Sequence, residues 1–287
     1  MNNRTGYGWF VLPSTLVFAT IVLVPFLIGI YYSMTEWNGI GKTAVWIGMK
    51  NYLEIFNDRE AWDSLWFTSR FTAVVVVLSN FLALVLALGL IEPIKGSGIL
   101  RIVFFLPNVI GGLILGFIWR FVYTQGFPSV GHLTGAAFFL LPWLGNASTG
   151  FWGLVIVYVW KTTGYLMVIY LAALLSVDRS LLESAQMDGA GYLSRLVNIQ
   201  LPMIMPAFTV CVFLMLSWAF KVFDVVYSLT NGGPYRATEA FTLNIYNEAF
   251  IYNNYGYGSA KAVLFFLFAA LISLVQVHFS KRREIDV

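Results

Sequence analysis

The chain has 287 residues, of which 59% are apolar, 17% aromatic and only 11% charged. Soluble domains carry about 25% charged residues, so this composition excludes a soluble globular enzyme. The apolar content also exceeds what one core of this size can bury, which predicts contact with lipid. The formal net charge of +3 is small and the basic residues are scattered, so we expect no nucleic-acid partner.

Six apolar segments are long enough to cross a bilayer, because a spanning helix needs about 20 mostly apolar residues. The charge-free stretch 123–150 contains several Gly and Pro residues and is expected to form an irregular external connection rather than a seventh span. The sequence predicts an all-α integral membrane protein with one transmembrane domain over residues 1–287. The predicted spans are 9–34, 71–91, 100–123, 151–175, 205–229 and 260–280.

Positive charge between the spans predicts the orientation, since Lys and Arg accumulate in cytoplasmic segments. With the amino terminus inside, eight basic residues lie in short cytoplasmic segments and five lie on the opposite side. Both termini are therefore expected in the cytoplasm. The cytoplasmic residues are Arg4, Lys95, Arg101, Arg179, Arg195, Lys281, Arg282 and Arg283, and the others are Lys42, Lys50, Arg59, Arg70 and Arg236.

The residue sets of common active sites are missing from the sequence. His132 and His278 are the two histidines and Cys211 is the single cysteine, so a metal cluster or a histidine-based triad has too few residues. Gly41-Lys42-Thr43 has the form of the end of a phosphate-binding loop, but Glu36 stands where that loop needs its first glycine. We predict no catalytic residues, no metal site and no cofactor bound by this chain.

The loop 176–202 carries the most informative pattern. Ser180 and Glu183 form a capping-box pattern, so a short helix is expected to begin there, and Gly189 with Gly191 is expected to end it. Leu and Ala residues give this helix one apolar face. Such a helix fits either docking into the groove of a partner or resting on lipid headgroups, and the pattern alone favours neither.

The spacing Glu183-x-Ala185-x-x-x-Gly189, then nine residues, then Ile199-x-Leu201-Pro202 resembles the cytoplasmic loop signature of the membrane subunits of binding-protein-dependent ABC importers. Ser184 differs, because the family usually has a second alanine there. The likeness covers most of the chain and is strongest to the carbohydrate branch, which imports maltose, multiple sugars or glycerol phosphate. Typical of the first permease of such pairs are Gly48 to Tyr52, Pro107, Trp119, Phe223-Asp224, Thr230 to Pro234, Thr238, Tyr246, Ala249-Phe250 and Tyr257 to Ala260.

The resemblance implies an ABC-importer permease fold in the cytoplasmic (inner) membrane of a prokaryote. It also implies a heterodimer with a second homologous permease, two ATP-binding cassette subunits and an extracytoplasmic solute-binding protein. The cassette subunits use ATP and Mg²⁺, so this chain is expected to be no enzyme. Gly189 is expected to take a positive φ. The implied ATPase-coupling residues are Glu183, Ser184, Ala185, Asp188, Gly189, Ala190, Ile199, Leu201 and Pro202.

Polar residues inside the predicted spans give candidates for a solute pathway, because charges there are costly and face a cavity or a partner. Lys161 lies too deep to reach the surface, and Tyr158, Thr162 and Tyr165 lie on nearby helix faces. By resemblance this stretch contributes to the central sugar site, where aromatic rings and hydrogen-bonding groups suit a sugar. Pairing of Lys161 with a carboxylate of the partner permease is the alternative.

A second group lies near the end of the fifth predicted span. Lys221 and Asp224 are three residues apart, so we expect an ion pair, and Trp218, Lys221 and Asp224 are further pathway candidates. Gly112 and Gly116 have the small-xxx-small spacing of closely packed membrane helices.

The remaining charged residues near span ends are interpreted as surface groups. Arg120 and Lys261 are expected to extend to the outer surface. Asp58, Glu60 and Asp63 are expected to form a solvated polar face.

The sequence thus predicts the permease subunit of an ATP-driven importer that moves a sugar or oligosaccharide by alternating access. Lys161 and Lys221 leave an anionic sugar or a sugar phosphate open as the solute. Two alternatives from other classes are an intramembrane lipid- or glycan-modifying enzyme and a passive channel. The enzyme would need converging carboxylates or histidines, which the sequence does not offer, and a channel would have no use for a docking loop.

Overall fold

The computed structural model describes residues 4–91 and 96–281. Lys95, Arg282 and Arg283, on which part of the predicted orientation rests, lie outside the described residues, and so do the side chains of Arg4 and Lys281. The chain divides into two compact units, residues 1–62 with 244–268 and residues 63–243 with 269–287.

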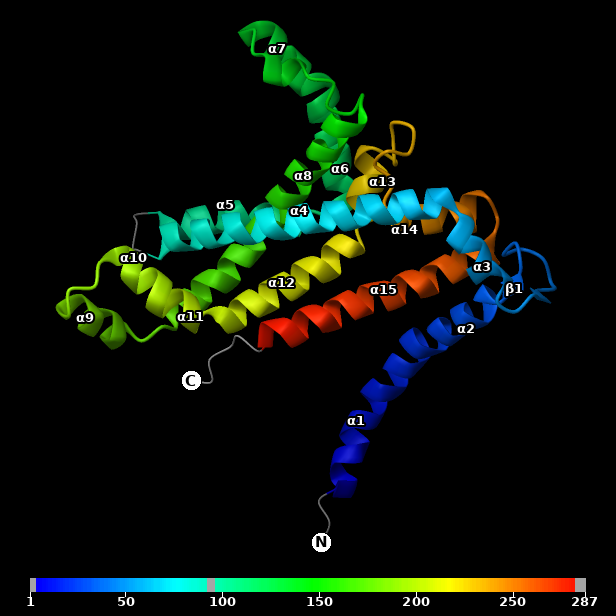
Figure 1. The fold of residues 1–287 in the computed structure, drawn as a ribbon, viewed down its shortest axis with the longest axis horizontal. Helices are drawn as coiled ribbons and strands as arrows, with labels where there is room; N and C mark the ends of the chain where they lie inside the picture. Colours follow the sequence, from blue (N-terminus) through cyan, green and yellow to red (C-terminus); the bar gives the residue numbers. More distant parts are fainter. Residues whose placement is uncertain (1–3, 92–95, 282–287) are drawn as a thin grey trace. The chain divides into compact units, whose positions relative to one another are not determined.

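The first unit is built on apolar helices and one small hairpin (Figure 1). Strands β1 and β2 pair antiparallel over two residues each, a feature that the all-α prediction did not include. The elements are α1 (Arg4–Phe18), the π-helical η1 (Ala19–Leu23), α2 (Val24–Ser33), β1 (Thr35–Glu36), β2 (Val45–Trp46), α3 (Lys50–Asn57), the π-helical η5 (Asn247–Ile251) and parts of α14 (Phe241–Tyr246) and α15 (Tyr255–Lys281).

The second unit is helical among its described residues, and its longest helices are α4 and α8. Asn146 begins α8 by accepting a hydrogen bond from the backbone N–H of Thr149 (2.9 Å). The elements are α4 (Arg59–Leu90), α5 (Ser97–Val109), α6 (Gly112–Phe121), η2 (Val122–Gly126), α7 (Phe127–Thr134), η3 (Ala137–Leu140), α8 (Ala147–Leu175), α9 (Arg179–Met187), α10 (Tyr192–Arg195), η4 (Leu196–Gln200), α11 (Leu201–Met203), α12 (Met205–Phe220) and α13 (Asp224–Leu229).

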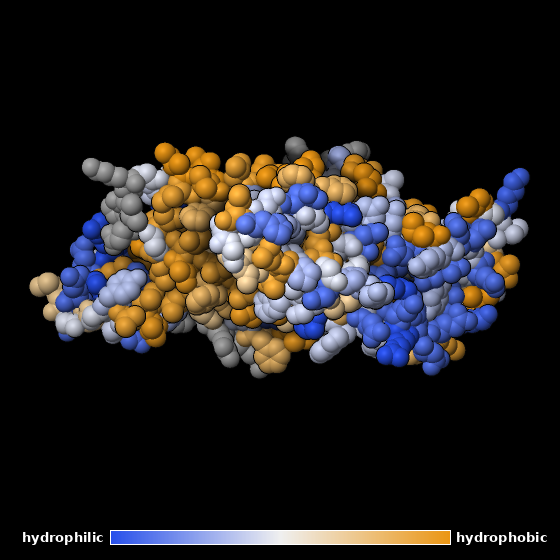
Figure 2. Space-filling model, turned by 90° about the horizontal axis from the view of Figure 1, so that it is seen from above, coloured by the Kyte–Doolittle hydropathy of each residue, from blue (hydrophilic) through white to orange (hydrophobic). Residues whose placement is uncertain are grey.

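Among residues 4–91 and 96–281, four helical stretches are long and apolar enough to cross a membrane, namely Val11–Ser33, Arg59–Leu90, Ala147–Leu175 and Tyr255–Ser280. They match the first, second, fourth and sixth predicted spans, although α4 begins well before residue 71. Large apolar side chains remain exposed on these helices, and Figure 2 shows hydrophobic side chains in continuous areas on the face in view. Apolar surface of this extent fits contact with lipid or with further membrane helices.

The third and fifth predicted spans are wrong as single helices. Ser97–Val109 and Gly112–Thr134 are bent by 98° at their junction, where Ile110 and Gly111 have extended backbone. Glycine is a poor helix former, so the Gly111-Gly112 pair gives the chain a place to break. The two bent pairs bring the number of possible spans to six.

The fifth predicted span, 205–229, is shorter in the structure, where α12 ends at Phe220. The backbone carbonyl of Val222 accepts a hydrogen bond from the Thr242 hydroxyl, a side-chain partner in place of the next helical N–H. Residues 224–229 then form the separate helix α13. At its other end, α12 meets the preceding helical stretch Tyr192–Met203 at a bend of 65°.

The connection 123–150 is more ordered than the sequence predicts. The backbone stays helical from α6 through Thr134, because the π-helical η2 leads directly into α7. Gly135 ends the helix with a φ of 70°. Trp143 folds back onto Tyr123, with ring centroids 5.2 Å apart, so aromatic packing replaces the irregular loop that we expected.

Three glycines let helices of the second unit approach closely. A Cβ on Gly112 would lie 2.5 Å from the Asp224 carboxylate, and one on Gly116 would lie 1.9 Å from the Ser228 hydroxyl, so the close packing predicted for this pair is confirmed. A Cβ on Gly164 would lie 1.9 Å from the Phe104 carbonyl oxygen, which brings α5 against α8. Asp224 and residues of α5 and α8 also line the cavity described next.

Candidate functional site

A cavity of about 340 Å³ opens within the second unit among α5, α8, α12 and α13. We call it the polar cavity. Besides the candidates from the sequence, it is lined by Asn108, Val222, Phe223 and Val225. All seven residues predicted for the solute pathway line it, namely Tyr158, Lys161, Thr162, Tyr165, Trp218, Lys221 and Asp224.

Sequence reasoning missed Asn108, which enters the polar cavity from the end of α5. An amide in an apolar stretch is a weaker sequence signal than a charge, so Asn108 does not stand out beside Pro107. The break at Ile110 and Gly111 follows directly, so Asn108 stands where the chain turns away from the helix.

Aromatic rings shape one part of the polar cavity. The rings of Tyr165 and Trp218 meet edge to face with centroids 5.2 Å apart, and Phe105 stacks on Tyr165 at 6.2 Å. The hydroxyl of Thr162 donates to the Tyr158 carbonyl at 2.9 Å and lies 3.0 Å from the Ser79 hydroxyl. Thr162 therefore fastens α8 to α4, and the rings present a rigid wall.

The charges of the polar cavity lack partners within the described part of the chain. No ion pair there joins Lys161 or Lys221 to a carboxylate, so the predicted pair between Lys221 and Asp224 is wrong. The prediction assumed one continuous helix, whereas α12 ends at Phe220 and α13 begins at Asp224. Two cations and one carboxylate thus line the same space.

The loop 176–202 contains the short helix that the sequence predicts, but its cap differs. The side chain of Asp178 caps α9 by accepting from the Ser180 N–H at 2.9 Å, and this hydrogen bond lowers the pKa of the Asp178 carboxyl. Glu183 instead pairs with Arg179, whose Nε lies 3.1 Å from its carboxylate. The capping box is therefore wrong, because Asp178 supplies an acceptor two residues earlier than Ser180.

The end of α9 has the turn expected at Gly189, whose φ is 84°. The Gly189 N–H donates to the Gln186 carbonyl at 3.0 Å and the Ala190 N–H to the Ala185 carbonyl at 2.9 Å. This pair of bonds is the Schellman motif, which favours a residue without a side chain at the positive φ.

Helix α9 has no buried residue, and its Met187 is 87% exposed. Glu183, Ser184 and Asp188 are exposed, and Ala185 is half-buried. The remaining members of the predicted coupling set, Ala190, Ile199, Leu201 and Pro202, are half-buried, the last three in η4 and α11.

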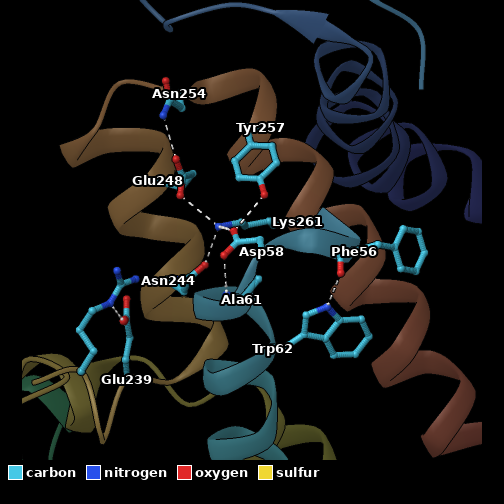
Figure 3. Close-up of polar contacts among 11 residues, drawn as sticks. Phe56, Asp58, Ala61, Trp62, Glu239, Asn244, Glu248, Asn254, Tyr257 and Lys261 are labelled. Carbon is cyan, nitrogen blue, oxygen red and sulfur yellow. Dashed lines mark hydrogen bonds and ion pairs between the residues drawn. The ribbon is translucent and has the colours of Figure 1, made fainter. Parts of the chain in front are cut away.

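The first unit contains a buried charge cluster that sequence reasoning placed at the surface. Lys261 is 1% exposed, and its Nζ lies 2.8 Å from Asp58, 3.0 Å from Glu248 and 2.9 Å from the Asn244 amide oxygen (Figure 3). The Tyr257 ring centroid is 4.6 Å from the same nitrogen. We call these five residues the Lys261 cluster.

Two surface predictions are therefore wrong. Lys261 does not extend to a surface, because α15 carries it against two carboxylates that saturate it. Asp58 is no free solvated group either: burial raises the pKa of its carboxyl, but hydrogen bonds from Lys261, Ala61 and Tyr257 outweigh burial and lower it. Glu60, Asp63 and Arg120 are exposed.

Comparison with known proteins supports one family. Residues 79–285 match the family described as binding-protein-dependent transport system inner membrane component. The chain is 44% identical, over 99% of its length and 97% of the relative, to the probable starch degradation products transport system permease protein AmyD of Thermoanaerobacterium thermosulfurigenes. It is 29% identical, over 99% of its length and 98% of the relative, to the multiple sugar-binding transport system permease protein MsmF of Streptococcus mutans.

A solved structure has the same fold. It is a bacterial alginate ABC transporter in complex with an alginate pentasaccharide-bound periplasmic protein, and the matched chain has a TM-score of 0.81 at 21% identity. The match covers 97% of this chain and 95% of that one. Fold and sequence together establish that the chain belongs to the inner membrane components of binding-protein-dependent transport systems, among the permeases of sugar ABC importers.

Proposed function

We propose that this chain is one of two permeases of an ATP-driven importer and that the polar cavity is its passage for a sugar or oligosaccharide. The observation that carries the proposal is the meeting of polar side chains from α8, α12 and α13 in one cavity of an otherwise apolar bundle. A sugar offers apolar faces to rings and hydroxyls to polar groups. The relatives named for starch degradation products and multiple sugars support this solute class.

Within the cavity, the edge-to-face pair Tyr165 and Trp218 is proposed to contact the sugar face. Lys161, Lys221 and Asp224 then supply hydrogen bonds to hydroxyls, and Tyr158 and Asn108 complete the polar lining. Thr162 holds α8 in place through its bonds to Tyr158 and Ser79.

An anionic sugar or sugar phosphate is the second candidate solute, and one observation favours it. Lys161 and Lys221 line the polar cavity with Asp224 as the single carboxylate, and no ion pair in the described residues neutralises either lysine. A bound phosphate or carboxylate would find two cations there.

The loop 176–202 is proposed to couple solute movement to ATP. In this proposal α9 enters a cleft of an ATP-binding cassette subunit through Glu183, Ser184, Ala185 and Asp188, turns at Gly189 and Ala190, and transmits motion through Ile199, Leu201 and Pro202 to α12. Helix α9 has no buried residue, which supports a role in contact with a partner. Two cassette subunits use ATP and Mg²⁺, and alternating access follows from rigid-body tilting of the helices.

The remaining parts of the proposal concern assembly and location. A second homologous permease forms the heterodimer, and an extracytoplasmic binding protein delivers the solute, as a periplasmic protein is bound in the alginate transporter. The chain lies in the cytoplasmic membrane with both termini in the cytoplasm.

The proposal is tested by reconstituting this chain with its second permease, cassette subunits and binding protein in proteoliposomes. We expect ATP-dependent accumulation of labelled maltooligosaccharide, and Trp218→Ala is expected to lower the initial rate while ATPase activity persists. Trp152→Ala is the matched control, because Trp152 is exposed on α8 away from the polar cavity. Uptake unchanged by Trp218→Ala would reject the cavity as the passage.

The coupling role is tested in the same vesicles with Glu183→Lys and Gly189→Asp. Both are expected to abolish uptake, either by releasing the cassette subunits or by leaving ATP hydrolysis uncoupled from transport. Leu193→Lys, on the exposed face of α10, is the control. Normal transport by the Glu183 and Gly189 variants would reject the docking role of α9.

A further inference from the structure

A second cavity of about 640 Å³ lies in the same unit, between the ends of α4 and α8 and the segments α9, α10 and η4. We call it the basic cavity. Of the residues assigned to solute passage or coupling, it contains Glu183 alone. Its lining has two chemically distinct parts, one apolar and one polar.

The apolar part comes from the two long helices. Leu88 lies in the last turn of α4 and Ile91 directly follows that helix, and Leu174 and Leu175 end α8. Leu175 is 57% exposed, so this part continues onto the apolar surface of the bundle. An acyl chain fits such a surface because burial of its CH₂ groups is favourable.

The polar part comes from the loop that follows α8. Arg195 of α10 donates through Nη1 to the Gln186 side chain at 2.8 Å. Its Nε is buried and has no hydrogen-bond partner among the described residues. A buried donor without an acceptor is costly, and a guanidinium presents its donors in a fork that matches phosphate oxygens.

The charges of the basic cavity leave an unbalanced cation. Arg179 is neutralised by Glu183 at 3.1 Å and is 91% exposed. Arg195 forms no ion pair with any carboxylate of the described residues. The cavity therefore has one uncompensated positive charge beside an apolar surface at a helix end, which is the arrangement of a site for an anionic lipid headgroup.

We propose that the basic cavity binds an anionic phospholipid, with its phosphate on Arg195 and an acyl chain along Leu88, Ile91 and Leu175. The proposal rests on the proposed function in one respect, namely that loop 176–202 lies at the cytoplasmic membrane surface. A lipid bound there joins the end of α8 to α10 and stiffens the base of the loop that carries α9.

The test uses native mass spectrometry of the full chain in mild detergent with equal amounts of dioleoyl phosphatidylglycerol and dioleoyl phosphatidylcholine. We expect selective retention of phosphatidylglycerol, and Arg195→Gln is expected to lower it about tenfold, the loss that follows from one charged hydrogen bond. Arg195→Lys is expected to keep most of the preference. The control Arg120→Gln removes an exposed charge from α6 and is expected to change nothing.

Three results would overturn the proposal. They are equal retention of both lipids, a preference for phosphatidylglycerol that survives Arg195→Gln, and displacement of bound phosphatidylglycerol by soluble glycerophosphoglycerol as effective as displacement by phosphatidylglycerol itself. Glycerophosphoglycerol has the headgroup without acyl chains, so the last result would mean that the acyl chain contributes nothing. Size-exclusion profiles of all variants establish that they are folded. Transport is measured separately. If uptake and its coupling variants behave as proposed while the lipid preference is absent, the lipid proposal alone fails, whereas absent uptake with an intact preference rejects the transport function alone.

Discussion

Lys261 of the first unit differs from Lys161 and Lys221 of the second in how its charge is compensated. Lys261 of the first unit touches two carboxylates, an amide oxygen and an aromatic ring, and it is fully buried. Lys161 and Lys221 of the second unit line a cavity without an ion pair in the described chain. A saturated cation can only hold structure together, whereas an open one has hydrogen-bonding capacity left for a solute.

The strongest test of this difference is Lys261→Met. Removal of the cation leaves Asp58 and Glu248 with an uncompensated buried charge, so we expect a loss of about 3–5 kcal/mol in unfolding free energy. Thermal unfolding of the purified chain in detergent, followed by helix content, measures it. The control is Lys161→Met, which deprives no carboxylate of a partner and is expected to leave the melting temperature nearly unchanged. Equal losses in both variants would erase the distinction between the two kinds of lysine.

The packing of α5 against α8, two helices that supply residues to the polar cavity, provides the next test. Gly164→Ala places a Cβ where the Phe104 carbonyl oxygen would be 1.9 Å away, so α5 must move from α8. We expect a loss of about 1–3 kcal/mol, typical of overpacking, together with slower uptake. Gly89→Ala in α4 is the matched control, because nothing lies within 4 Å of its added Cβ. An equally tolerated Gly164→Ala would mean that this contact does not shape the cavity.

The open lysines are tested by comparing two solutes in the reconstituted transporter. If the solute is anionic, Lys161→Gln and Lys221→Gln are each expected to raise its KM about tenfold, the loss of one charged hydrogen bond. Glycerol 3-phosphate and maltotetraose are the probes, and a neutral sugar is expected to respond less. Unchanged KM values for both probes in both variants would remove the lysines from the passage.

Sequence periodicity predicted much of the fold, because long apolar segments have few alternatives to membrane helices. The positions that it misjudged are those set by tertiary contact. The Gly111-Gly112 pair marks a weak point in residues 100–123, but nothing in the sequence predicts that the chain bends there and brings Gly112 to Asp224. The spacing of a single helix predicted an ion pair between Lys221 and Asp224, whereas α12 ends at Phe220 and α13 begins at Asp224.

The two lysine sites differ in whether the sequence alone could identify them. Tyr158, Lys161 and Trp218 were predicted together because a deep charge and aromatic rings stand out in apolar helices, and the cavity gathers them. The partners of Lys261 are at positions 58, 244 and 248, in other elements than its own helix α15. Local spacing therefore could not reveal them, and the position of Lys261 near the end of a predicted span favoured the surface instead.

The smallest expected effect concerns the acid dependence of the Lys261 cluster. Although burial raises the pKa of Asp58, its hydrogen bonds with Lys261, Ala61 and Tyr257 lower it below the ordinary value of 3.8. A carboxyl with a lowered folded-state pKa stabilises the fold above the unfolded pKa, and this contribution is lost as the pH falls through the folded pKa. The melting temperature of the purified chain is therefore expected to fall below about pH 4. The Asp58→Asn variant should have a lower melting temperature at neutral pH, and its melting temperature should change less across this acid range. Asp63→Asn, which removes an exposed carboxyl, is the control and should keep the acid dependence. An Asp58→Asn variant that keeps the full acid dependence would mean that Glu248 alone holds Lys261.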